Sequence, residues 1–233
     1  MDRRPKKPKD EGPLFTPITP YLERAMERAD ARRAEAKRAR GGDVIFLASA
    51  IPTQMGCDRR NVEIKARTED PSGVAARARA IADRGPIVFF QDDTYFDCPE
   101  GRLKVRIESG SVGELIFYAR ADTKAAKESR YRIVPTSDPF GMINTMLERY
   151  AVLGQVRKER TLFLVGNARI HLDDVENLGS CFVEIEVVLS EDETVEQGTA
   201  TVALLMERLG IRKKDLIRES YIDLFSKGPT SGG

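Results

Sequence analysis

The stretch Asn61-Val-Glu-Ile-Lys-Ala-Arg67 alternates polar and apolar residues without interruption. Successive side chains of a β-strand point to opposite faces of its sheet, so Val62, Ile64 and Ala66 share one face and the charged residues share the other. The alternation predicts a strand that separates two different surroundings, one apolar and one charged.

The same alternation returns along the chain and defines the expected fold. Besides 61–67, strands are expected at 87–96, 102–108, 114–120, 130–134, 156–165, 168–173 and 181–189. Turn residues such as Gly166-Asn167 leave only short connections, which favours hairpins and an antiparallel sheet. Helices are expected at 71–84, 138–151 and 195–209, with a short helical tail reaching position 225. The predicted fold class is α+β.

Charged side chains on the polar faces of these strands sort by sign. Basic residues occupy alternate positions of consecutive strands, namely Lys65, Arg67, Lys104, Arg106, Arg120, Arg130, Arg132, Lys158, Arg160 and Arg169. Carboxylates gather towards the first and last strands, as Glu63, Asp173, Glu184 and Glu186. A solvated outer face is the ordinary explanation for any one strand, but it does not explain the sorting.

A curled sheet would explain the sorting. The charged face would then line a lumen, and the apolar face would point outward beneath the helices. Buried like charges must be paired or neutralised by a ligand. Guanidinium and ammonium groups bind phosphate oxygens, whereas Mg²⁺ prefers carboxylate oxygens and water. The pattern therefore indicates a polyanion bound together with a divalent cation.

Several motifs in a fixed order carry a family resemblance. They are Asn61-Val-Glu-Ile-Lys65, Gly101-Arg-Leu-Lys-Val-Arg106, Lys127-Glu-Ser-Arg-Tyr131, Val156-Arg-Lys-Glu-Arg160, and Arg169-Ile-His-Leu-Asp173 followed by Phe182-Val-Glu-Ile-Glu186. In this order they resemble the CYTH domain family, the triphosphate tunnel metalloenzymes. The closing Ser220-Tyr-Ile-Asp-Leu224 is most similar to the class IV adenylyl cyclase-like branch.

The resemblance implies an antiparallel eight-stranded β-barrel, a tunnel, with helices packed on the outside. It implies a small-molecule triphosphate substrate and Mg²⁺ or Mn²⁺ as cofactor. The substrate-binding residues that it implies are Lys65, Arg67, Lys104, Arg106, Arg120, Lys127, Arg132, Lys158, Arg160 and Arg169. The metal ligands that it implies are Glu63, Asp173, Glu184 and Glu186.

Three residues need their own interpretation. Asn61 stands where the family usually has Glu, and its amide brings no negative charge, which weakens the expected metal binding. Lys65 lies beside other cations, which favours loss of its proton and a catalytic role in deprotonation. His171 is expected to be a hydrogen-bonded strand residue, since nearby carboxylates would keep it from acting as a free base.

The expected reaction is hydrolysis of inorganic, thiamine or nucleoside triphosphate by a metal-bound or lysine-polarised water. A class IV adenylyl cyclase, which converts ATP to cyclic AMP and pyrophosphate, is the alternative, although it also requires an adenine pocket. A non-catalytic triphosphate or polyphosphate binder is the second alternative, and a basic-faced scaffold without ligand is the third. The chain has no G-x-x-x-x-G-K loop, which excludes the P-loop route.

Composition excludes other classes. The 233-residue chain has a net charge of +1, with +5 in residues 1–60 and −4 in the rest, so its body is unlike a broad nucleic-acid surface. No apolar run approaches the ~18 residues that span a bilayer. One histidine and three separated cysteines form neither a His-cluster metal site nor a disulfide framework. We expect a reducing compartment, and no membrane or specific nucleic-acid partner.

The expected organisation has three parts. Residues 1–60 are predicted to form a basic N-terminal extension with a helix at 21–40, residues 61–226 the tunnel domain, and residues 227–233 a flexible tail. An Arg-rich extension is compatible with a mitochondrial leader, but its nine acidic residues favour a cytoplasmic protein. The sequence leaves the oligomeric state open, with a homodimer among the alternatives.

Overall fold

The computed structural model describes residues 59–99, 101–108, 112–120 and 125–226. The expected N-terminal extension lies outside these residues except for its last two positions, and so do its helix at 21–40 and the tail at 227–233.

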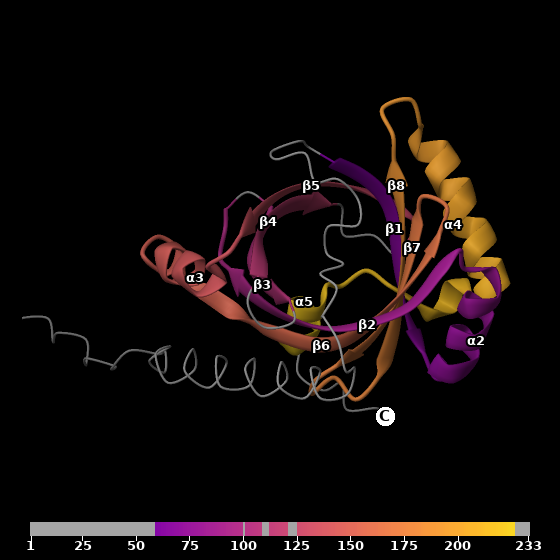
Figure 1. Ribbon diagram of the computed structural model, residues 1–233, viewed down its shortest axis with the longest axis horizontal. Coiled ribbons are helices and arrows are strands. Elements are labelled where there is room, and N and C mark those ends of the chain that lie inside the picture. The colour runs from indigo at the N-terminus through magenta and orange to yellow at the C-terminus, as the bar shows by residue number, and fades with distance from the viewer. Residues whose placement is uncertain (1–58, 100, 109–111, 121–124, 227–233) are drawn as a thin grey trace, which may run out of the picture. The chain divides into compact units, whose positions relative to one another are not determined.

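Strands dominate the described part of the chain (Figure 1). In chain order the elements are β1 (Arg59–Thr68), α2 (Pro71–Ile81), β2 (Arg84–Phe96), β3 (Arg102–Glu108), β4 (Val112–Arg120), β5 (Lys127–Thr136), α3 (Pro139–Leu147), β6 (Val152–Val165), β7 (Ala168–Val175), β8 (Cys181–Leu189), α4 (Val195–Leu209), a 3₁₀ turn (Lys213–Asp215), β9 (Leu216–Ile217) and α5 (Tyr221–Ser226).

Eight of the strands close into an antiparallel barrel. Their order is β5-β4-β3-β2-β6-β7-β8-β1, and β1 pairs back onto β5 to complete the ring. Closure removes the two exposed edges that an open sheet would have. The short β9 pairs with the second half of β1, through Lys65 opposite Ile217. The expected eight-stranded barrel is confirmed, with β9 as an addition.

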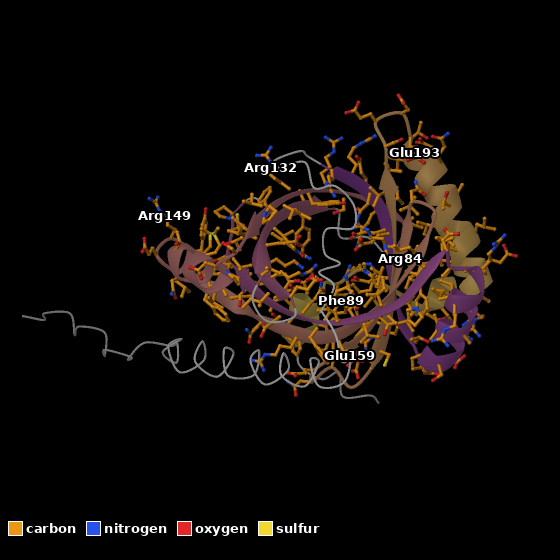
Figure 2. All side chains as sticks on the ribbon, viewed as in Figure 1. Arg84, Phe89, Arg132, Arg149, Glu159 and Glu193 are labelled. Carbon is orange, nitrogen blue, oxygen red and sulfur yellow. The ribbon has the colours of Figure 1, made fainter. Side chains whose placement is uncertain are left out.

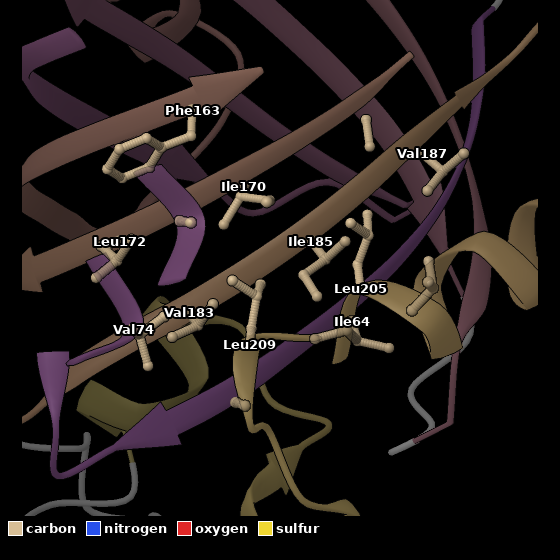
Figure 3. Packing of buried hydrophobic residues seen from close by; sticks show 14 of the residues in the cluster. Ile64, Val74, Phe163, Ile170, Leu172, Val183, Ile185, Val187, Leu205 and Leu209 are labelled. Carbon is tan, nitrogen blue, oxygen red and sulfur yellow. The ribbon is translucent and has the colours of Figure 1, made fainter. Parts of the chain in front are cut away.

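The outer face of β1, β7 and β8 is apolar and is covered by α2 and α4 (Figure 3). Ile64 of β1 and Ile185 of β8 pack in one buried cluster with Val74 of α2 and Leu205 and Leu209 of α4. Burying such a side chain stabilises the fold by roughly 1.5–3 kcal/mol. This cluster lies outside the barrel wall, which leaves the inner face to the charged residues.

The other helices lie against different strands. α3 packs against β3 and β4, and α5 packs against β6. Tyr221 and Ile222 of α5 form a second apolar cluster with Phe182 of β8. Gly154 of β6 permits the approach of α5, because a Cβ at this position would lie only 2.7 Å from Ile222 Cδ1. None of the helices in the described ranges is both long and apolar enough to cross a bilayer.

Local signals set the ends of the helices. The Asp70 side chain accepts from Gly73 N at 2.8 Å and caps α2, and Thr194 forms a capping box with Gln197 at the start of α4. α2 ends at Ile81, three residues earlier than expected, because Asp83 N already donates to Leu164 O of β6 at 2.8 Å. The strand β2 therefore begins at Arg84 instead of at residue 87.

Candidate active site

A cavity of about 240 Å³ lies inside the barrel. All eight barrel strands contribute to its lining, and Ser220 and Tyr221 of the C-terminal segment complete it. Alternation along each strand decides which residues face it, as the lining positions 61, 63 and 65 of β1 illustrate.

Most of the expected site residues face this cavity. The basic residues in its lining are Lys65, Lys104, Arg106, Lys158, Arg160 and Arg169 among those expected, together with Arg59 and Arg84. The expected metal ligands in its lining are Glu63, Glu184 and Glu186. The structure thus brings together side chains from six strands that are far apart in the sequence.

Three of the expected basic residues lie outside the lining, and so does the expected metal ligand Asp173. Arg67 lies at the exposed end of β1, where it donates to Ser180 Oγ at 3.1 Å and stacks on Phe182. Lys127 is buried, and its Nζ donates to the carbonyl oxygen of Arg218 at 3.4 Å. Arg132 is exposed on the outside of the barrel (Figure 2). The side chain of Arg120 lies outside the described residues.

The outward position of Arg132 has a simple cause. Tyr118 of β4 lies opposite Tyr131 of β5 and both line the cavity, so the neighbouring Arg130 and Arg132 must point outward. The expectation that Arg130 and Arg132 share the basic face with the other strands is therefore wrong.

One buried carboxylate organises three of the cations. Arg106 donates to Asp93 from Nε at 2.7 Å and from NH2 at 2.9 Å, and Lys104 Nζ lies 2.8 Å from the same carboxylate. Lys158 Nζ completes the group at 3.5 Å. Burial opposes ionisation of Asp93, but these cations outweigh it and hold its pKa well below the usual value.

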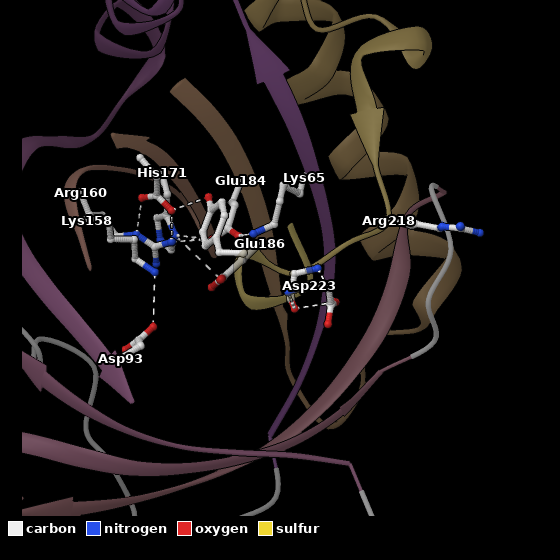
Figure 4. Close-up of polar contacts among 12 residues, drawn as sticks. Lys65, Asp93, Lys158, Arg160, His171, Glu184, Glu186, Arg218 and Asp223 are labelled. Atoms are coloured by element: carbon white, nitrogen blue, oxygen red, sulfur yellow. Dashed lines mark hydrogen bonds and ion pairs between the residues drawn. The ribbon is translucent and has the colours of Figure 1, made fainter. Parts of the chain in front are cut away.

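A second cluster joins β1, β6, β7 and β8 (Figure 4). Arg160 donates to both oxygens of Asp173 at 2.6 Å and to Glu184 at 2.5 Å, and Glu184 also forms an ion pair with Lys65. Burial opposes ionisation of Glu184, but Lys65 and Arg160 lower its pKa well below the usual value. Two carboxylates and two cations therefore hold one another in fixed positions.

The C-terminal segment takes part in this second cluster. The hydroxyl of Tyr221 donates to Asp173 Oδ2 at 2.7 Å, and the ring of Tyr221 lies 3.2 Å from Lys65 Nζ and 5.1 Å from Lys158 Nζ. An ammonium over an aromatic face is attracted by the ring quadrupole. The segment after β9 thus positions two cations and one carboxylate of the cavity.

Three residues offer ligand atoms to a cation. One ligand atom from each of His171, Glu184 and Glu186 lies within 4.8 Å of the others. Among the described residues, Nδ1 of His171 is buried and has no hydrogen-bond partner. Burial and Arg160 lower the pKa of His171, which favours the neutral imidazole that a metal needs.

This donor set fits a divalent metal. A neutral imidazole and two carboxylates suit Mn²⁺, and the carboxylates suit Mg²⁺. The set differs from the expected one, because neither Asp173 nor Glu63 belongs to this group of three. Asp173 accepts hydrogen bonds from Arg160 and Tyr221. His171, expected to be an ordinary hydrogen-bonded residue, lies within the group instead.

Sequence reasoning missed Asp93 and Tyr221. The strand that carries Asp93 is apolar at both ends and carries an Asp92-Asp93 pair in its middle, so its polar face was not apparent. Alternation with Gln91 and Tyr95, both of which line the cavity, is the signal that indicates the face of Asp93. No sequence pattern places Tyr221 beside Lys65, because that contact depends on how the C-terminal segment folds back.

A closed antiparallel barrel with clustered cations and carboxylates inside is a tunnel fold. The model of the CYTH domain matches residues 59–221, and the chain belongs to this family. The match covers the whole barrel and ends at the tyrosine that contacts Lys65.

Two similar proteins each cover 70% of this chain. A putative adenylate cyclase of Methanocaldococcus jannaschii is 23% identical over 172 residues, which cover 70% of this chain and 97% of the relative. A protein of Pyrococcus horikoshii OT3 has a similar structure, with a TM-score of 0.63, 25% identity, and coverage of 70% of this chain and 98% of that one.

A third relative shares the fold at lower identity. A putative adenylyl cyclase from Hippeastrum, described as having a dominant triphosphatase activity, gives a TM-score of 0.53 and 17% identity, and covers 72% of this chain and 96% of its own. At this identity the likeness shows the barrel fold alone.

Proposed function

We propose that this protein is a divalent-metal-dependent enzyme that hydrolyses a triphosphate held inside the barrel. One observation carries the proposal: the ligand atoms of His171, Glu184 and Glu186 cluster within 4.8 Å in the cavity that the buried cations line. A protein that only bound a polyanion would need the cations alone. Grouped carboxylates beside them support a metal-assisted reaction.

The cations bind and orient the phosphate chain. Arg106 and Arg160 are fixed by Asp93 and Asp173, so their guanidinium groups are placed before the substrate arrives. Lys104, Lys158 and Lys65 add ammonium groups that neutralise the charge developing on phosphate oxygens.

His171, Glu184 and Glu186 would hold Mg²⁺ or Mn²⁺. When bound, this metal neutralises phosphate charge and makes a coordinated water more acidic. Lys65 was expected to accept a proton, but its ammonium group is paired with Glu184 and lies over the ring of Tyr221, and an ammonium has no lone pair for a proton. Its proposed role is therefore to bind phosphate and to polarise the attacking water.

Cyclisation of ATP is the second candidate reaction. The relative from Methanocaldococcus jannaschii is named a putative adenylate cyclase, which supports this candidate. Both reactions use the same phosphate-binding residues and differ in the attacking oxygen, which comes from water in one and from the ribose 3′-hydroxyl in the other.

A product analysis tests the proposal. Purified full-length protein is given tripolyphosphate, thiamine triphosphate or ATP with Mg²⁺ or Mn²⁺, and phosphate, pyrophosphate and cyclic AMP are resolved. We expect metal-dependent phosphate release that falls at least about a hundredfold in Glu186→Gln. Glu159→Gln is the matched control, because Glu159 is exposed on the outside of β6 (Figure 2).

Each outcome has a clear meaning. Pyrophosphate with cyclic AMP would identify the cyclase. Tight tripolyphosphate binding without turnover of any substrate would identify a binder and contradict an enzymatic role. Equal activities of Glu186→Gln and Glu159→Gln would exclude the proposed metal-ligand group.

A further inference from the structure

One wall of the cavity is apolar. Ile87 and Phe89 of β2 and Leu162 and Leu164 of β6 all line it, and all four are partly exposed. Ile87 lies opposite Leu162 across the β2–β6 pairing. Phe89 lies two positions from Ile87 on β2, and Leu164 lies two positions from Leu162 on β6, so each pair shares one face of its strand. These four side chains therefore form one continuous surface, called here the apolar wall.

The apolar wall lies directly beside the charged side chains around Arg160 and His171, called here the charged centre. Leu162 is opposite His171 of β7, and Phe89 is opposite Arg160 of β6. One ligand can consequently contact the wall and the phosphate-binding side chains at the same time. Its apolar part would lie at the β2–β6 side, and its anionic part would lie among the cations.

Inorganic triphosphate cannot cover this wall. Apolar surface that remains in contact with water is unfavourable, and a phosphate chain offers only charged oxygens. A flat organic ring joined to the triphosphate would cover Phe89 and its neighbours by stacking and apolar contact. The wall therefore favours an organic ester of triphosphate over the free inorganic anion.

The charges at the wall favour a neutral ring. Arg84 lies opposite Leu164 on one side and Arg169 lies opposite it on the other, and both line the cavity. Glu186 of β8 lies opposite Arg169 and pairs with it at 3.8 Å, so the guanidinium of Arg84 is the charge that would repel the cationic ring of thiamine. Guanidinium groups stack readily on nucleobases. Glu108 of β3 lies opposite Gln91, two positions along β2 from Phe89, and Gln91 donates to it at 3.3 Å. Neither Glu108 nor Glu114 lies opposite Arg84 or Leu164.

We infer that the substrate is a nucleoside triphosphate whose base rests on the apolar wall formed by Ile87, Phe89, Leu162 and Leu164. The inference rests on the proposed function, because it assumes that the cations bind a triphosphate. It adds the residues that distinguish a nucleotide from inorganic triphosphate.

Calorimetric titration tests the inference. The probes are a non-hydrolysable ATP analogue, tripolyphosphate and thiamine triphosphate, each titrated with Mg²⁺ into the full-length protein. Wild type should bind the ATP analogue more tightly than either other probe. Phe89→Ala should weaken binding of the analogue about tenfold and change tripolyphosphate binding by less than about twofold.

Phe117→Ala is the matched control. Phe117 is 38% exposed on β4 and lies on the opposite face from Ile116 and Tyr118, which line the cavity. This variant should leave both affinities unchanged. Leu164→Ala serves as a second wall variant if Phe89→Ala melts well below wild type, and it should show the same selective loss.

The outcomes separate the inference from the proposed function. If wild type binds tripolyphosphate at least as tightly as the ATP analogue, the inference fails and the proposed function stands. An equal loss for both probes in Phe89→Ala and Leu164→Ala, or no loss for either, also overturns the inference. If no probe binds, the proposed function itself fails.

Discussion

The ammonium group of Lys65 lies 3.2 Å from the centroid of the Tyr221 ring, although the two residues come from opposite ends of the domain. The hydroxyl of the same tyrosine donates to Asp173. Lys65 belongs to β1, the first strand of the barrel in chain order, and Tyr221 begins the last described helix, α5. The contact therefore couples the site to the fold of the C-terminal segment.

Substitution of Tyr221 should separate its two contributions to stability. Tyr221→Phe removes the hydrogen bond to Asp173, while both hydrogen bonds from Arg160 to Asp173 remain. This variant should reduce the free energy of unfolding by about 1 kcal/mol. Tyr221→Ala also removes the buried ring and should cost about 3–5 kcal/mol. Urea denaturation measures both values, with Tyr150→Phe as a control. Equal losses for the two Tyr221 variants would mean that the ring contributes nothing.

Asp93 should stabilise the empty cavity and oppose anion binding. Asp93→Asn leaves Lys104, Arg106 and Lys158 without their shared counter-charge and should lower the free energy of unfolding by about 3–5 kcal/mol. Tripolyphosphate can replace the lost charge, so it should raise the melting temperature of this variant more than that of wild type. Thermal melts with and without the ligand provide the test.

Asp174→Asn is the control for this prediction, because Asp174 lies exposed on the outer face of β7 next to the buried Asp173. It should melt like wild type with and without tripolyphosphate. A larger ligand effect in Asp174→Asn than in Asp93→Asn would contradict the role given to Asp93.

Binding of triphosphate should take up protons above neutral pH. Burial and Arg106 lower the pKa of Lys104 to about 7, and burial and Arg160 lower the pKa of Lys158 to about 8. At pH 9 both amines are mostly neutral, and a bound anion raises their pKa and recharges them. At pH 6 both are already protonated, so the uptake should disappear.

Calorimetry in two buffers of different ionisation enthalpy measures this uptake. Lys104→Arg is the informative variant, because a guanidinium group stays charged throughout this pH range. The variant should therefore lack the share of the proton uptake that Lys104 contributes. The unfolded lysines hold their protons up to higher pH than the folded ones. These two groups should therefore make the ligand-free protein more stable as pH rises from 7 to 10. Equal uptake in wild type and Lys104→Arg would contradict the assignment.

Asn61 should limit the affinity of the cavity for metal. Its Oδ1 is buried, and it has no hydrogen-bond partner among the described residues. Asn61→Asp keeps the size of the side chain and adds a negative charge to the inner face of β1, two positions before Glu63. We expect Mn²⁺ to bind several-fold more tightly, because the added charge attracts the cation. Asn144→Asp, on the exposed side of α3, should have no effect in the same titration.

The strands and their faces could largely be predicted from the sequence. Alternation placed Lys65, Lys104 and Arg160 on the inner face, because the two-residue period of a strand is local geometry. The same reasoning was wrong for Arg132, since the short segment around it carries polar residues at both odd and even positions, so alternation does not assign a face. There the pairing with β4 decided the face, and pairing is not encoded in one strand alone.

The sequence by itself determined the alternating strands, the sorting of charges and the order of motifs, since each of these depends on neighbouring positions in the chain. Only the tertiary structure decided which charges meet. Pairing of β2 with β3 and with β6 brought Asp93 to Lys104 and Lys158, and the folding back of the last helix brought Tyr221 to Lys65. It also placed the apolar wall beside the charged centre. Contacts of this kind depend on sheet register and helix packing between distant segments, which local sequence patterns do not specify.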